Sequence, residues 1–376
     1  MISLYVHVPF CRRKCPYCDF YSSDTNLDIL DHYHHDLIKH LQVARLGGWK
    51  GPVKTLFFGG GTPSLLTPNQ VALLVDAVDQ QFGFAPGAEI TMEGNPSSLN
   101  HENLSGFRNA GVNRLSIGVQ SLDETHLTLL GRQHTAGQAE KVFCQARKAG
   151  FDNLGADLMF ALPGESLSDL ERDLDRFLRL EAEHLSCYGL TIEPGTEFAA
   201  RRDKGEFALP DEDRYADQYQ HLHDRLSSVG YRHYEIANYC QPGFECQHNL
   251  NYWQRRSFLG IGAGAHSFSL REWGVREAVP PDLERYSRLL AGGHDPAELL
   301  ERFDREGATR ETVYLALRSA DGLDAEAFLD RFGESFDQMF ADEILKSAPW
   351  LSREESHWRL QVGGWLIFDH LISRFL

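Results

Sequence analysis

Strand-like and helix-like segments alternate along the first part of this 376-residue chain. Strand-like runs occupy 3–8, 55–58, 89–93, 115–119, 153–159 and 185–190, and helical periodicity marks 27–46, 67–82, 100–110, 122–149, 166–180 and 211–229. This alternation requires a parallel sheet, and right-handed crossovers curl such a sheet toward a barrel. The sequence therefore predicts an α/β fold.

Chemically distinctive residues fall where these predicted strands end. A cysteine segment starting at Cys11 follows the first strand, and glycines 59–61 follow the second. Glu93 and Gln120 end the third and fourth strands, and Asp157 falls within the fifth. Because the carboxyl ends of parallel strands meet at one edge, where chemistry collects in such folds, these residues are expected to form one site.

Three cysteines follow the first strand closely. Cys11, Cys15 and Cys18 are separated by three and by two residues. Three thiolates at this spacing can hold three irons of a cubane [4Fe–4S] cluster and leave the fourth iron without a protein ligand. Zinc needs a fourth ligand at familiar spacing, which does not follow closely, and a disulfide needs a secreted context. The spacing favours the cluster over both alternatives.

The surroundings of these thiols should favour metal binding. Arg12, Arg13 and Lys14 lie between the first two cysteines, and their charge is expected to lower the thiol pKa values. The scattered cysteines are predicted to be small buried or half-buried residues; they are Cys144, Cys187, Cys240 and Cys246.

Composition narrows the class of protein. An apolar content of 42% with 11% aromatic residues is that of a globular protein, and the net charge of −17 argues against a nucleic-acid partner. The amino terminus lacks the basic and apolar pattern of a signal peptide, and no run is apolar enough for a membrane span. We therefore expect a cytoplasmic protein in a reducing compartment.

The cysteine loop, with Tyr17 before its last cysteine, resembles the signature of the radical S-adenosylmethionine (SAM) superfamily. Other segments are similar to the branch that contains oxygen-independent coproporphyrinogen III dehydrogenase (HemN) and the haem chaperone HemW. These segments are 5–11, 59–63, 90–96, 114–121, 130–132, 157–159 and 248–253.

The resemblance implies a partial (β/α)6 TIM-like barrel over residues 1–290, with extra elements at about 231–270 closing one side. It also implies a small, mainly helical, winged-helix-like domain over 291–376. The Gly292-Gly-His-Asp-Pro296 stretch, which interrupts the periodic pattern, agrees with a boundary there.

By the same resemblance, the site holds a [4Fe–4S] cluster and SAM. Gly60, Gly61 and Thr62 would receive the amino-acid end of SAM, and glycine lets backbone approach a ligand closely. Six further residues match SAM-contacting positions of the dehydrogenase: Tyr5, Tyr17, Glu93, Gln120, Arg132 and Asp157. Carboxylates suit ammonium and hydroxyl groups and arginine suits a carboxylate, although Arg132 and Asp157 could instead form an ordinary salt bridge.

Two features differ from the dehydrogenase. It carries a further cysteine where this chain has Phe20, and it has a long amino-terminal extension, whereas ten residues precede Cys11 here. Both differences argue against tetrapyrrole decarboxylation.

The segment His248-Asn-Leu-Asn-Tyr-Trp253 resembles the HNxxYW motif associated with the haem chaperone. Haem iron accepts an axial imidazole, and aromatic rings can pack against a macrocycle. From the residues alone, a loop held to the barrel by this His-Asn pair and the two aromatic residues is the favoured explanation. Cys246 is a rival haem ligand or a buried apolar filler.

The expected function is that of a haem chaperone that binds the cluster, SAM and haem and delivers haem to acceptor proteins, membrane-bound respiratory proteins among them. The alternative is a radical SAM enzyme acting on a tetrapyrrole, either coproporphyrinogen III dehydrogenase or a related methyl transfer or ring opening. The amphipathic run 365–376 fits either docking on a membrane-bound acceptor or packing in the core.

Overall fold

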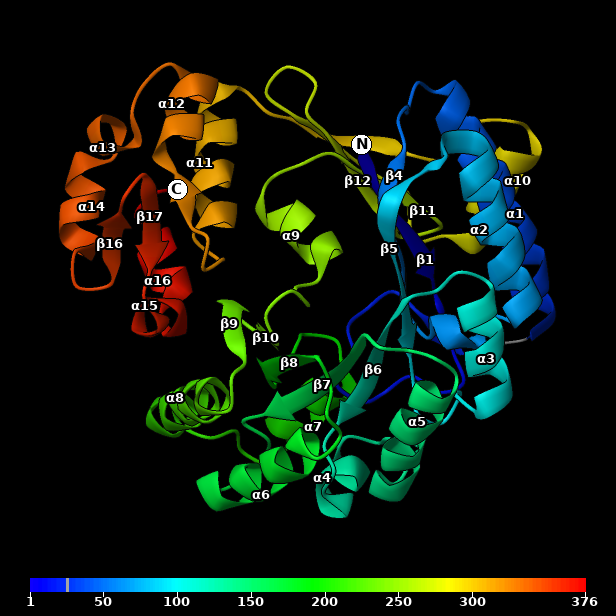
Figure 1. Cartoon of the computed structure of the whole chain (residues 1–376), viewed down its shortest axis with the longest axis horizontal. Helices are drawn as coiled ribbons and strands as arrows, with labels where there is room; N and C mark the ends of the chain where they lie inside the picture. The colour runs from blue at the N-terminus through cyan, green and yellow to red at the C-terminus, as the bar shows by residue number, and fades with distance from the viewer. Residues whose placement is uncertain (25–26) are drawn as a thin grey trace.

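A computed structural model of the chain describes residues 1–24 and 27–376. Within them a twelve-stranded sheet runs in the order β14-β13-β12-β11-β1-β4-β5-β6-β7-β8-β10-β9 (Figure 1). Its parallel strands are β11 (Phe258–Ile261), β1 (Ile2–Val8), β4 (Val53–Gly60), β5 (Phe84–Gly94), β6 (Arg114–Gln120), β7 (Leu154–Phe160) and β8 (His184–Gly189). The predicted α/β fold is confirmed.

Helices cover the outer face of the sheet. They are α1 (Leu27–Leu46), α2 (Pro68–Phe82), α3 (His101–Asn109), α5 (Ala136–Lys148), α6 (Leu167–Leu178) and α8 (Glu212–Ser228). Leu4 and Val6 of β1 pack in the same buried core as Leu37 of α1. The alternate residues of β1, Tyr5 among them, face the barrel interior, because successive strand side chains point to opposite faces.

The segment expected to be one helix over 122–149 forms two helices, α4 (Glu124–Leu129) and α5. Gly131 has a left-handed φ of 65°, which ends the first helix. Thr135 then starts the second with a capping box in which Thr135 and Gln138 bond reciprocally. The helix α7 (Glu197–Asp203) was not predicted.

Antiparallel strands extend both edges of the sheet. β10 (Asn238–Cys240) and β9 (Arg232–Glu235) follow β8, while β12 (His266–Ser269), β13 (Val275–Ala278) and β14 (Glu298–Arg302) follow β11. The expectation that residues 231–270 close one side of the barrel is therefore wrong, since they add to both edges. β14 and β9 do not pair with each other, so the barrel is partial.

The carboxyl-terminal region is mainly helical. It contains α11 (Arg305–Ala316), α12 (Ala325–Phe332), α13 (Phe336–Met339), α14 (Ala341–Ser347), α15 (Val362–Leu366), α16 (Phe368–Ile372) and a small sheet of β15 (Leu323–Asp324), β17 (His357–Leu360) and β16 (Leu351–Glu354). The main sheet runs to residue 302, past the boundary predicted at 290.

The amphipathic end of the chain packs inside this region. Its apolar residues are buried in the core; they include Trp365, Phe368, Leu371 and Phe375. Of the two alternatives for this segment, core packing is therefore the one that the structure has. Across the described ranges 1–24 and 27–376, the helices all fall short of the length and apolar character needed to cross a membrane.

Candidate functional site

The cysteine loop leaves β1 at the carboxyl ends of the parallel strands, which we call the mouth of the barrel. Two short parallel strands pair with each other and hold the two ends of the loop together. They are β2 (Phe10–Cys11) and β3 (Ser23–Asp24). The Cys11 side chain is buried, and Cys15 and Cys18 are partly buried. Thr62 Oγ1 donates to Cys11 Sγ at 3.6 Å. The loop therefore presents its thiols toward the glycine segment of the next strand.

The donor set fits a cluster better than a single ion. Within the described residues, no three His, Cys, Asp or Glu side chains converge closely enough to hold one metal ion. A cubane is bound at separate irons, so its three thiolates lie farther apart than the ligands of one ion. Three thiols on one loop fit a cube with one open iron.

The expectation of a lowered thiol pKa is wrong for Cys18 in the ligand-free protein. Burial raises the pKa of the Cys18 thiol, and the opposing effect of Lys14 is smaller. The basic residues of the loop are exposed, where water screens their charge. Binding of iron to Cys18 must therefore displace its proton.

The glycine segment after β4 lies directly against the cysteine loop. Gly60 has a left-handed φ of 114°, and a Cβ there would lie 2.8 Å from the imidazole of His7. A Cβ on Gly61 would lie 2.7 Å from the backbone of Phe10. Only glycine permits this approach, so the backbone of the segment is held against His7 and Phe10, at the start of the cysteine loop.

Two half-buried carboxyl groups line the mouth, those of Glu93 and Asp157. Glu93 Oε2 accepts the Gly60 amide at 3.3 Å, and burial together with the Asp157 carboxylate raises the pKa of Glu93 to about 8. Asp157 accepts from Ser116 Oγ at 3.2 Å, and burial raises the Asp157 pKa. Desolvated acids of this kind bind a cationic ligand strongly, because pairing recovers the lost hydration.

Arg132 joins the cysteine loop to β6. Its Nη1 donates to Cys15 Sγ at 3.5 Å and its Nη2 donates to the Gly118 carbonyl, while its buried Nε has no hydrogen-bond partner. No carboxylate of the described residues forms an ion pair with Arg132, so the salt bridge weighed against ligand binding does not form. The unpartnered Nε is suited to an incoming carboxylate.

Gln120 and Tyr17 complete the mouth. Gln120 has a left-handed φ of 72°, a strained backbone for a residue other than glycine, and its Oε1 accepts from Tyr188 Oη at 2.6 Å. The Tyr17 ring packs edge-on against Phe198 at 6.1 Å, and burial raises its pKa. The structure thus brings the three cysteines and all nine predicted SAM contacts to one end of the barrel interior.

His248 lies at the other end of the interior, among the amino ends of the strands, which we call the floor. It sits on α9 (Gln247–Trp253) and is only 1% exposed. Its Nδ1 lies 2.7 Å from Thr55 Oγ1 and its Nε2 lies 2.8 Å from Tyr252 Oη. Neither nitrogen is free for haem iron in this conformation, so His248 as haem ligand stays a prediction.

Cys246 is equally enclosed. It is fully buried, its Sγ lies 3.7 Å from Glu89 Oε1, and burial raises its pKa to about 12. A protonated thiol inside the protein is a poor ligand. The geometry therefore favours Cys246 as a buried packing residue over Cys246 as a haem ligand.

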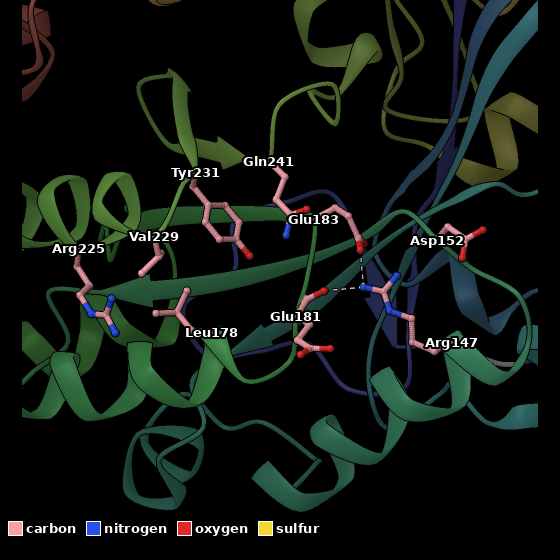
Figure 2. A pocket seen from close by; sticks show the side chains of 9 residues that line it. All are labelled: Arg147, Asp152, Leu178, Glu181, Glu183, Arg225, Val229, Tyr231 and Gln241. Carbon is pink, nitrogen blue, oxygen red and sulfur yellow. Dashed lines mark hydrogen bonds and ion pairs between the residues drawn. The ribbon is translucent and has the colours of Figure 1, made fainter.

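A surface hollow lies away from the mouth, near the amino ends of β7 and β8 (Figure 2). Its volume is about 710 Å³, and Arg147 and Arg225 are among the residues that line it. Arg147 donates to the Phe151 and Glu181 carbonyls and to the Glu183 carboxylate, which itself accepts the Leu154 amide. These hydrogen bonds hold together the turns that lead into β7 and β8. The guanidinium of Arg147 therefore has a structural role, and we assign no ligand to this hollow.

Sequence reasoning missed several residues of the interior. Arg114 is 1% exposed and its Nε has no hydrogen-bond partner. In the sequence it stands only as the first residue of the matching segment 114–121. His7 bonds Tyr5 Oη at 3.1 Å, and Tyr188 bonds Gln120. The period-two pattern could have found His7 and Arg114, because each shares a strand face with a predicted contact, whereas Tyr188 lies on β8, which carries no predicted contact.

Comparisons with known proteins agree with this geometry. The sequence model of the Radical SAM superfamily matches residues 5–177, and that of the HemN C-terminal domain matches residues 303–367. The “Heme chaperone HemW” of Lactococcus lactis is 34% identical over 100% of this chain and 97% of its own length. That of Bacillus subtilis is 33% identical over 100% and 99%.

Among solved structures, coproporphyrinogen III oxidase (HemN) from Escherichia coli, described as a radical SAM enzyme, has the same fold. Its TM-score is 0.85 at 24% identity, over 100% of this chain and 89% of that one. Identity above 30% along the whole length of two curated relatives shows the family. This chain belongs to the HemW family of the radical SAM superfamily.

Proposed function

We propose that this protein is a haem chaperone that holds a [4Fe–4S] cluster and SAM, binds haem, and delivers it to acceptor haem proteins. The observation that carries the proposal is the full-length similarity to proteins named haem chaperones. The mouth supports the cofactor part, because three thiols, a glycine cradle and two desolvated acids meet there.

Each part of the mouth has a role in this proposal. Cys11, Cys15 and Cys18 hold the cluster, and Gly60, Gly61 and Thr62 receive the amino-acid end of SAM. A reduced cluster, once bound, can supply an electron to a sulfonium group. The nearby side chains bind and orient SAM: Tyr5, Tyr17, Glu93, Gln120, Arg132 and Asp157.

The two desolvated acids and Arg132 give the pocket its selectivity. Glu93 and Asp157 face an ammonium or hydroxyl groups, and the free Nε of Arg132 faces a carboxylate. SAM carries an ammonium group, ribose hydroxyls and a carboxylate, so it can pair with Glu93, Asp157 and Arg132 at the same time.

The compartment belongs to the same proposal. No disulfide joins cysteines within the part of the chain that the structure describes, which supports a reducing cytoplasm, where thiolates remain available to iron. The haem acceptors we propose include respiratory proteins in the membrane.

A specific observation favours a second candidate, an enzyme acting on a tetrapyrrole. The whole chain shares the fold of the coproporphyrinogen III oxidase structure. Phe20, 71% exposed, stands where the dehydrogenase has a further cysteine, and it weighs against that candidate.

One anaerobic assay separates the two. Reconstituted protein is incubated with reductant, SAM and coproporphyrinogen III, and in parallel haem-loaded protein is mixed with an apo haem protein. A chaperone gives no vinyl product and transfers haem. Sustained formation of vinyl product would establish the enzyme instead.

A further inference from the structure

The imidazole of His248 is held on two sides by hydrogen bonds. Thr55 of β4 bonds its Nδ1 and Tyr252, one helical turn further along α9, bonds its Nε2. Burial lowers the pKa of His248 to about 3, so the ring is neutral. A neutral ring with both nitrogens bonded has one orientation, since turning it would break a buried hydrogen bond.

The start of α9 is fastened to the neighbouring strand. Glu89 of β5 accepts the amides of Gln247 and His248, each at 3.1 Å, and thereby supplies the cap that Cys246 does not provide. Thr55 and Glu89 are paired across β4 and β5. Two adjacent strands therefore fix both the helix and the ring that it carries.

His248 also contacts aromatic rings that lead toward the mouth. It stacks on Phe57 at 5.0 Å and 25°, and its centroid lies 6.3 Å from that of Tyr5. Tyr5 Oη bonds His7 Nδ1 at 3.1 Å, and His7 Nε2 lies 3.1 Å from the Tyr21 carbonyl, just beyond the cysteine loop. The floor is thus connected to the loop through packed and bonded side chains.

The other end of α9 meets the carboxyl-terminal region. The guanidinium of Arg318 lies 4.8 Å from the Trp253 ring centre and 5.2 Å from that of Phe368 on α16. The Arg318 carbonyl accepts the Ile236 amide at 3.1 Å, next to β9. Figure 1 shows α9 between this region and the sheet.

We propose that His248 is a positioning residue of the SAM pocket: it fixes the ring of Tyr5, and its helix joins that pocket to the carboxyl-terminal region through Trp253 and Arg318. The inference rests on the proposed function, in which Tyr5 lines the pocket. It gives the HNLNYW segment a role in SAM binding in place of direct contact with haem.

Three substitutions test the inference on reconstituted full-length protein. His248→Gln keeps one amide near the Tyr252 position and loses the ring, while Thr55→Val and Tyr252→Phe each remove one bond and leave the imidazole. We expect His248→Gln to weaken SAM binding about tenfold and each of the others about threefold. Thr55→Val should add nothing in the His248→Gln background, because the two act through one contact.

Tyr286→Phe is the matched control. Tyr286 Oη lies 3.2 Å from His40 Nδ1, a buried tyrosine–histidine bond on the outer face of the sheet. Tyr286→Phe should lower the stability toward denaturant as much as Tyr252→Phe does, and it should leave the SAM affinity unchanged. General destabilisation is thereby separated from positioning.

Haem titration supplies the opposing readout. His248→Gln should keep the haem stoichiometry and Soret position of the wild type. Loss of haem with unchanged SAM affinity would assign the imidazole to haem and overturn the inference. Equal SAM affinity in the wild type and all three variants would overturn this inference and leave the proposed function intact. Wild-type protein that binds no SAM would overturn both the proposed function and this inference.

Discussion

The mouth and the floor of the barrel both bury titratable side chains, but they differ in how these side chains are bonded. At the mouth, Arg132 keeps an Nε without a partner and Glu93 is held by one backbone amide. At the floor, His248 and Glu89 are bonded at each polar side-chain atom. The unfilled bonding capacity of Arg132 indicates a place for a ligand, whereas the filled capacity of His248 and Glu89 indicates a structural joint.

The largest effect is expected from the cysteine loop. Cys15→Ser should leave the protein without a stable cluster, because a cube held by two thiolates loses iron readily. Iron and sulfide analysis after anaerobic reconstitution checks this. Cys144→Ser, on the exposed face of α5, is the matched control and should retain full iron.

The next effect concerns Glu93. Glu93→Gln should weaken SAM binding about 10- to 100-fold, because a buried charge partner is removed. The pKa of about 8 means that the ligand-free carboxyl is protonated at neutral pH and must ionise to bind a cation. Affinity in the wild type should therefore contain a component that rises with pH and levels off above about 8.

That component should be missing from Glu93→Gln, and calorimetric titration with SAM between pH 6 and 9 measures it. Asp157, Arg114, Tyr5 and Tyr252 also face Glu93, so the comparison with Glu93→Gln isolates its own part. A wild-type profile identical in shape to that of the variant would contradict this assignment.

A smaller effect, on stability rather than on the cluster, is expected at the floor. Glu89→Gln should lower the free energy of unfolding by about 1–3 kcal/mol, because one of the two α9 amides loses its acceptor inside the protein. Denaturant unfolding of the cluster-free protein measures this. If the variant were instead fully stable and lost its cluster, the distinction between floor and mouth would be wrong.

The sequence predicted the mouth far better than the floor. Cys11, Gly60 and Glu93 lie next to the ends of strands, so period and motif together placed them at one edge. His248 and Thr55 are 193 residues apart, and α9 is seven residues long, so no local pattern relates them. Their contact depends on how the chain returns across the sheet, which only the folded structure reveals.

The smallest effect is expected at Cys246. Cys246→Ala removes one buried sulfur, which should cost about 1 kcal/mol of stability and leave haem binding as it is. Haem titration followed at the Soret band checks this. Loss of that band would make Cys246 the ligand and would move the haem site to the floor.

Electron paramagnetic resonance of the reduced, reconstituted protein, recorded with and without SAM, tests the central claim most directly. The account predicts about four irons and four sulfides per chain and a spectrum that changes when SAM is added, because SAM binds the open iron. A protein that takes up no iron and sulfide, or a cluster spectrum that SAM leaves unchanged, would contradict it.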